Sequence, residues 1–128
     1  MIDTNVLVSA LWTPAGNASL ILSEIISGTI TPCYDERIMQ EYRDVLVRPK
    51  FMFSSVQVNA VLDVFVYDGI AVVPDFLPEA DVKDEDDRAF FETAKYCGVP
   101  LVTGNLKHFP ADSMIMSPAD FCAQYLSE

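Results

Sequence analysis

The sequence predicts an α/β fold, a parallel sheet with helices on both faces, in a single domain that spans residues 1–128. Short β-type runs alternate with segments of helical periodicity, which is the pattern of such sheets. A chain of 128 residues has the length of one domain, and a hydrophobic content of 51% is enough for a sizeable core. The sequence has no internal repeat, low-complexity tract or linker that would divide it.

The expected elements are separated by glycine and proline, the residues that most often end helices. Only Met1 and Ile2 precede Asp3, so either the first strand is very short or the natural chain begins further upstream. The longest irregular segment is residues 74–83. Strands are expected at residues 29–34, 70–73, 101–103 and 114–116. Helices are expected around residues 20–25, at 35–47, at 55–67, at 87–97 and from Ser117 onward. The first four of these helices end at Gly28, before Pro49, at Gly69 and at Gly98.

The charge balance excludes one class of nucleic-acid protein. Eight Lys and Arg residues against 19 Asp and Glu residues give a net charge of −11. A basic protein that coats nucleic acid needs a cationic surface, and this chain cannot supply one. A nucleic-acid enzyme stays possible, because clustered carboxylates can be held for metal ions.

The termini and cysteines favour a cytoplasmic protein. The first residues lack the basic region of an export signal. Residues 4–23 carry no charge, but a proline, a glycine and two asparagines interrupt them, so no membrane span is expected. The three cysteines match no zinc spacing or disulfide framework and are expected to be thiols buried in a reducing compartment: Cys33, Cys97 and Cys122.

Two acids face inward on their predicted helices. Glu41 lies three residues after Ile38 and four before Val45, on or beside the apolar face. Asp87 precedes Phe90 and Phe91 by three and four residues and shares their face. A buried carboxylate is costly unless a cation or a donor lies beside it. The alternative for Glu41 is a side chain at the edge of the stripe that reaches solvent.

The three acids before Asp87 have a simpler explanation. Asp84 is placed to cap the helix, while Glu85 and Asp86 lie at its positive end, where acids are favourable. Asp86 is rotated by about 100° from Asp87 on an ideal helix and is expected to face solvent.

Asp3, Glu41 and Asp87 are expected to meet at one end of the sheet, where parallel strands gather functional groups. Three neighbouring carboxylates repel one another unless they are protonated or bridged by a divalent cation. Oxygen ligands favour Mg²⁺ or Mn²⁺ over zinc. His108 is the only histidine, which disfavours a zinc site or a Ser-His-Asp triad.

In their order and spacing, three segments resemble the motifs of the PIN domain family, which includes the VapC type of toxin in toxin–antitoxin systems. The opening IDTNVLVSAL resembles the first motif, and QEYRDVL, with Glu41, the second. DEDDRAFFETAKYCGVPLVTGN resembles the third and fourth, with Asp87 in the acidic position. The stretch VTGNLKHF is similar to a subgroup of such toxins, and the resemblance covers nearly the whole chain.

The resemblance implies a Rossmann-like three-layer α/β/α sandwich with a mostly parallel five-stranded sheet. It also implies Mg²⁺- or Mn²⁺-dependent cleavage of RNA by in-line attack of a metal-activated water, and a protein antitoxin as partner. The metal ligands would be Asp3, Glu41 and Asp87, with Asn5 and Thr103 holding the carboxylates through hydrogen bonds.

The chain departs from the family at one catalytic position. Many members carry a fourth acid where this chain has Asn105. An amide oxygen can bind a metal ion or its water, but it adds no charge, so a second metal site is in question. Asp84 would replace the missing acid in part.

Basic residues that could contact RNA are few. Arg48 and Lys50 flank Pro49, and Lys107 and His108 follow Asn105. These four are the candidates for phosphate contacts. The alternative is that they only solubilise the surface.

Two other functions compete with a ribonuclease toxin. A catalytically weak PIN module that binds RNA or a protein partner is favoured by Asn105 and by the net charge of −11. A haloacid-dehalogenase-like phosphatase would use Asp3 as its nucleophile, but it needs a second Asp where this chain has Asn5.

Residues 56–67 predict a homodimer. They are apolar around most of the helix rather than along one stripe. Such a helix is usually covered on two sides, by the sheet and by a second subunit. The alternative is a helix deep in the core of a monomer.

Overall fold

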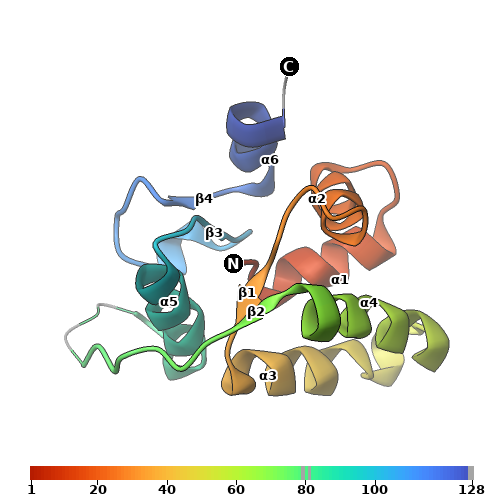
Figure 1. Ribbon diagram of the computed structural model, residues 1–128, viewed down its shortest axis with the longest axis horizontal. Coiled ribbons are helices and arrows are strands. Elements are labelled where there is room, and N and C mark those ends of the chain that lie inside the picture. The colour runs from red at the N-terminus through yellow and green to blue at the C-terminus, as the bar shows by residue number, and fades with distance from the viewer. Residues whose placement is uncertain (79, 81, 127–128) are drawn as a thin grey trace.

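The computed structural model describes residues 1–78, 80 and 82–126 and confirms the α/β class. Residues 79 and 81 of the predicted irregular segment, and residues 127–128 of the predicted domain, lie outside the described residues. The elements are α1 (Thr4–Trp12), α2 (Asn17–Ile26), β1 (Cys33–Tyr34), α3 (Glu36–Leu46), the 3-10 turn η1 (Pro49–Phe51), α4 (Ser55–Asp68), β2 (Ile70–Ala71), α5 (Glu85–Cys97), β3 (Leu101–Val102), η2 (Leu106–His108), β4 (Ile115–Met116), α6 (Pro118–Phe121) and the π-helical turn η3 (Cys122–Leu126) (Figure 1).

Helix boundaries follow the local signals in the sequence. The side chains of Asp35 and Ser54 cap α3 and α4 by accepting backbone N–H groups, at 2.8 and 3.1 Å. Gly98 ends α5 in the left-handed region, with φ of 66°. Gly69 ends α4 for a different reason, since a Cβ there would lie 2.4 Å from the Phe65 carbonyl oxygen.

One helix was not anticipated as a separate element. The predictions began with a helix around residues 20–25, whereas α1 starts directly after Asp3. Asp3 itself supplies the N-cap, because its carboxylate accepts the Thr4 N–H at 2.8 Å. The acid expected at the site is therefore also the start signal of a helix.

The strands are shorter than predicted and pair in two groups. β1 pairs with β2, β3 pairs with β4, and Ile2 joins β3 through a bridge to Val102, all in parallel. Among the described residues these segments do not form one continuous five-stranded sheet. Residues 29–32 stay outside β1 because Ile30 donates its N–H to the Glu24 carbonyl of α2.

The first strand is thus a single bridged residue that places Asp3 beside β3. Figure 1 shows the N-terminus at the centre of the molecule, close to β1 and β3. The Tyr42 hydroxyl of α3 donates to the Ile2 carbonyl at 2.5 Å and holds the N-terminal segment against α3. Tyr42 is fully buried against Phe65 and Phe90, at centroid distances of 5.5 and 6.2 Å.

An ion-pair cluster with two buried carboxylates and a half-exposed arginine joins α3 to α5. Arg37 contacts Asp35 at 2.6 Å and Glu92 at 2.8 Å, and Glu92 is only 1% exposed. The second oxygen of Glu92 accepts the Leu77 N–H at 2.6 Å, which ties the segment after β2 to α5. The Glu92 carboxylate is tolerated in the interior because Arg37 neutralises its charge and the Leu77 N–H satisfies its second oxygen.

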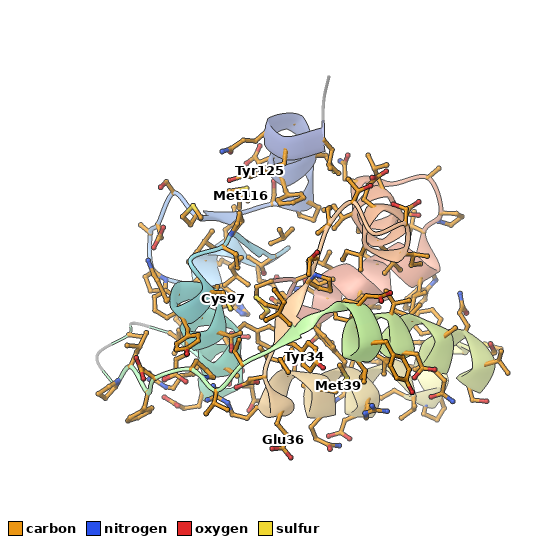
Figure 2. The ribbon with its side chains drawn as sticks, viewed as in Figure 1. Tyr34, Glu36, Met39, Cys97, Met116 and Tyr125 are labelled. Carbon is orange, nitrogen blue, oxygen red and sulfur yellow. The ribbon has the colours of Figure 1, made fainter. Side chains whose placement is uncertain are left out.

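The cysteines are free thiols, as expected. Cys33 and Cys122 are buried, whereas Cys97 is partly exposed at the end of α5 (Figure 2). Among the described residues, no single helix is long and apolar enough to cross a membrane. Only α1 and α2 taken together meet the length and composition criteria, and they are bent by 97° at the break between them.

Candidate metal centre and its acidic pocket

The predicted acids line one pocket of about 370 Å³. Asp3 reaches it from the end of the first bridged segment, Glu41 from α3 and Asp87 from the first turn of α5. Asp84, Asp86, Asn5, Thr4, Arg48, Asn105 and His108 also line it. We call this cavity the acidic pocket.

Asp3 is the most buried of the three acids, at 6% exposure. One of its oxygens accepts the Thr4 N–H, and the other accepts the Thr103 hydroxyl at 2.7 Å. Burial raises the pKa of Asp3, and these two hydrogen bonds lower it only in part. The carboxylate is therefore rigidly held in a place that disfavours its charge.

Glu41 lies on the inner edge of α3, between the buried and the exposed face. The Thr4 hydroxyl donates a hydrogen bond to its Oε2 atom. Desolvation raises the pKa of Glu41, the Thr4 hydrogen bond lowers it, and the charges of Asp3, Asp86 and Asp87 raise it further. Thr4 is a site residue that was not predicted, although its position directly after Asp3 was a visible signal.

Asp87 points into the pocket with a buried oxygen that lacks a hydrogen-bond partner. The Nδ1 atom of His108 lies 3.3 Å from this Oδ2 atom, within ion-pair range but outside hydrogen-bond geometry. Burial and the charges of Asp3 and Asp84 raise the pKa of Asp87 to about 6, against the opposing effect of His108. An orphaned carboxylate oxygen of this kind suits a cation.

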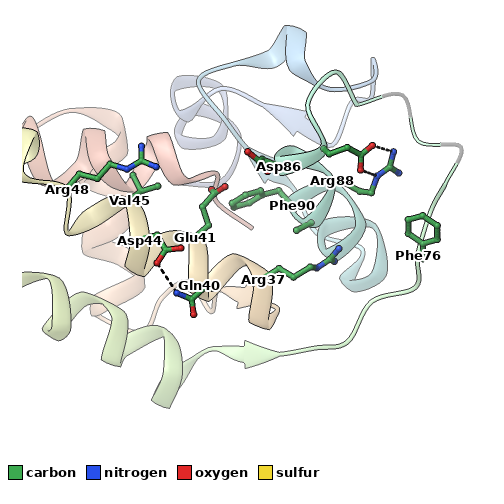
Figure 3. A pocket seen from close by; sticks show the side chains of 12 residues that line it. Arg37, Gln40, Glu41, Asp44, Val45, Arg48, Phe76, Asp86, Arg88 and Phe90 are labelled. Atoms are coloured by element: carbon green, nitrogen blue, oxygen red, sulfur yellow. Dashed lines mark hydrogen bonds and ion pairs between the residues drawn. The ribbon is translucent and has the colours of Figure 1, made fainter.

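Two other acids of the run, Asp84 and Asp86, behave differently from each other. Asp84 caps α5 by accepting the Asp86 N–H at 3.0 Å. Asp86 is exposed, as its helical register predicts. It nevertheless lines the acidic pocket, and Figure 3 shows it on the wall that faces Glu41. The helical register predicted that Asp86 is exposed, but it could not predict that α3 lies opposite.

The predicted supporting residues gather around the Asp3 carboxylate. Thr103 donates to Asp3 and accepts the Asn105 N–H at 3.0 Å. Asn5 holds no carboxylate among the described residues. Its side-chain oxygen instead accepts the Gly104 N–H at 3.3 Å and fixes the loop after β3. Asn105 lines the pocket at the position of the missing fourth acid.

The four basic candidates fall into two groups. Arg48 and His108 line the acidic pocket, where His108 contacts an acid instead of facing open space. Lys50 and Lys107 are exposed and are absent from the described lining. The Lys50 ammonium lies over the Phe51 ring, 5.1 Å from its centroid.

The donor set fits a hard divalent cation, although its geometry is open. Carboxylate and amide oxygens surround the pocket, and the pKa values of Asp3, Glu41 and Asp87 are all raised. Among the described residues, no group of three His, Cys, Asp or Glu side chains is close enough to hold a metal ion. Binding an ion therefore requires side chains such as Glu41 and Asp87 to move inward.

The metal-free protein is expected to lose stability as the pH rises from about 5 to 7. The folded state raises the pKa of Asp3, Glu41 and Asp87, so it binds protons more readily than the unfolded chain. The stabilisation is complete at low pH and is lost as the pH rises through about 6, the pKa of Asp87. We expect a loss of about 1 kcal/mol, because water screens part of the full effect.

Urea unfolding in excess chelator at several pH values measures this loss. Added Mn²⁺ should reverse it at pH 7, because a cation replaces the protons. A free energy of unfolding that rises steadily from pH 5 to 7 in chelator would contradict the electrostatics of the acidic pocket.

Comparison with known proteins gives one match. A family model described as PIN domain matches residues 1–107. The match covers every residue that lines the acidic pocket except His108. Neither a search of curated proteins nor a search of solved structures found a match.

Proposed function

The chain belongs to the PIN domain family, and from this premise we propose that it is a metal-dependent ribonuclease that acts as the toxin of a toxin–antitoxin system. PIN domains are generally nucleases that use divalent metals. The observation that carries the proposal for this chain is the convergence of Asp3, Glu41 and Asp87, from three separate segments, on the acidic pocket. Three acids with raised pKa values in one pocket are poised for a cation.

In this proposal the three acids would hold Mg²⁺ or Mn²⁺. The ion would lower the pKa of water and neutralise charge on the phosphoryl oxygens. Thr103 and the α1 N-terminus fix the Asp3 carboxylate, and Thr4 orients Glu41. The orphaned oxygen of Asp87 completes the set. No side chain would be needed as a covalent nucleophile, because water activated by the ion would attack the phosphorus in line.

Cleavage of a generic single-stranded RNA is expected only when Mg²⁺ or Mn²⁺ is present. Excess chelator should abolish cleavage, and Mn²⁺ added in excess of the chelator should restore it. The measurement is the appearance of shorter products on a denaturing gel, with heat-denatured protein as the control. Undiminished cleavage in chelator would overturn the proposed mechanism.

The second candidate is a PIN module that binds RNA or a protein partner and turns over poorly. Asn105 in place of an acid and the open arrangement of the described acids favour it. It predicts RNA binding without cleavage by the parent protein at every metal concentration. A ribonuclease instead shows cleavage that Asp3→Asn removes while binding persists.

The finer architecture of the family is part of the proposal. A mostly parallel five-stranded sheet between two helical layers requires the two pairs of strands to join through the segment at Ile2. The five parallel segments of the chain, and the position of Ile2 beside β3, support this arrangement.

The proposed toxin would work as a homodimer and be held inactive by a protein antitoxin. On α4, Val58, Val61, Leu62 and Phe65 face the core, while Val56 and Tyr67 are 79% and 80% exposed. A second subunit would cover these exposed side chains. Light scattering is expected to return the dimer mass, and a monomer mass at high concentration would contradict it.

A further inference from the structure

A second groove opens beside the acidic pocket, between α3 and α5 (Figure 3). Its volume is about 570 Å³, within the range of ligand sites. Arg37, Arg48, Arg88 and Phe76 are among its lining residues, and we call it the arginine groove. Three of the four arginines of the chain line this groove, together with the acids Glu41, Asp44, Glu85 and Asp86.

The arginine groove adjoins the acidic pocket. Glu41, Val45, Arg48 and Asp86 line both cavities. Figure 3 shows Arg48 at one end of the groove and Phe76 at the other, with Arg37 between them. A ligand with one group at the acids can therefore extend along the groove toward Phe76.

The Phe76 ring is exposed, and it packs against an arginine that is itself held in place. Its side chain is 70% exposed, and the Arg88 guanidinium lies 5.7 Å from the ring centroid. Arg88 in turn is held by Glu85 at 2.8 Å and by the Leu77 carbonyl. A ring supported on one face and open to the groove is a platform on which a planar base can stack.

Arg48 lies where the two cavities meet, just after the end of α3. Among the described residues its guanidinium has no hydrogen-bond or ion-pair partner, so its donors are available. Four acids also line the groove walls: Glu85 pairs with Arg88, Glu41 accepts the Thr4 hydroxyl, Asp44 accepts a hydrogen bond from Gln40 at 2.9 Å, and Asp86 is exposed. A phosphate at Arg48 thus meets a free cation.

We infer that the arginine groove holds the unpaired RNA strand next to the cleaved phosphate, with a base on Phe76 and a backbone phosphate at Arg48. This inference rests on the proposed function and adds the form of the substrate. A base can stack on a side chain only after it has left its duplex, so the groove selects single strands over double strands. Phe76 is then a residue that determines this selectivity.

Binding in excess chelator tests the groove without any need for cleavage. The probe is a short labelled single-stranded RNA, followed by fluorescence anisotropy. Phe76→Ala is expected to weaken binding about 5- to 100-fold, which is the range for loss of one base–aromatic stack. Phe76→Trp should stay near the parent because it keeps the stacking face. Tyr96→Ala is the matched control, an aromatic 55% exposed on α5 outside the groove lining.

The salt dependence of the same binding tests Arg48. Arg48→Ala should reduce the slope of log K against log salt by about 0.7–1, the loss of one phosphate contact. Arg43→Ala is the control, because it removes the same charge from α3 on a different surface. Weak binding of a duplex of the same sequence should not change with Phe76→Ala.

The outcomes separate the groove from the proposed function. If Phe76→Ala and Arg48→Ala bind single strands like the parent, and the parent cleaves RNA, the groove assignment is wrong and the ribonuclease stands. Equal losses for Tyr96→Ala or Arg43→Ala would also overturn the groove. If the parent neither binds nor cleaves RNA with any divalent metal, both proposals are wrong, and a protein partner becomes the ligand to seek.

Discussion

An Asp3→Asn variant is expected to lose Mn²⁺-dependent RNA cleavage by about 10³-fold or more while keeping its fold. Asp3 is the most buried acid of the acidic pocket, and its substitution removes one of three proposed ligands. Loss of a residue that only supports a metal ligand typically costs 10- to 100-fold, so loss of a ligand should cost more. Initial cleavage rates and calorimetric Mn²⁺ titration measure the two effects.

The substitution is close to isosteric, which separates chemistry from folding. Asparagine keeps an oxygen for the Thr4 N–H and is itself a good N-cap, so α1 should begin unchanged. Because burial raises the pKa of Asp3, the neutral amide should leave stability in chelator equal or higher at pH 7. Asp120→Asn, at an exposed acid in the first turn of α6, is the control. An Asp3→Asn protein that cleaves at the rate of the Asp120→Asn control would remove Asp3 from the site.

Local signals predicted the helices well because capping and helix termination act over a few residues. Asp35, Ser54, Asp84 and Ser117 all accept N–H groups of the helices that they begin. Strand lengths were overestimated because pairing depends on distant partners. Residues 29–34 were predicted as a strand, yet the Ile30 N–H bonds to α2, and only Cys33 and Tyr34 of that run pair with β2.

Helical spacing identified which acids turn inward, since a stripe fixes the direction of a side chain on its own helix. It could not show what lies opposite. Asp86 is exposed as predicted, but α3 brings Glu41 to face it, so it still lines the acidic pocket. For the same reason the pairing of Arg37 with Glu92 was not predicted, because these two residues are 55 positions apart in the sequence. Contacts between elements depend on how the elements pack, and the periodicity of one helix carries no information about that packing.

Asp87→Asn is expected to abolish cleavage and weaken Mn²⁺ binding, whereas Asp86→Asn should keep most of both. The two acids are neighbours in the first turn of α5, and each substitution removes one charge from the same helix end. They differ in environment. Asp87 presents a buried oxygen without a hydrogen-bond partner, and Asp86 is exposed on the wall of the pocket.

The stability of the two variants in chelator gives a second, independent measurement. The pKa of Asp87 is raised to about 6 by burial and by the charges of Asp3 and Asp84, so its ionised form is unfavourable at pH 7. Asp87→Asn removes that repulsion and should raise the melting temperature of the metal-free protein. This gain should outweigh the loss of an acid near a helix N-terminus, a few tenths to about 1 kcal/mol.

Asp86→Asn should show the loss at the helix end, with a small gain because a charge that raises the pKa of Glu41 is removed. Its Mn²⁺ affinity should therefore stay within a few-fold of the parent. If Asp86→Asn loses the metal and Asp87→Asn retains it, the ligand from α5 is the exposed acid and the assignment of the site is off by one residue. If both variants bind Mn²⁺ like the parent, α5 supplies no essential ligand and the proposed three-acid centre is wrong.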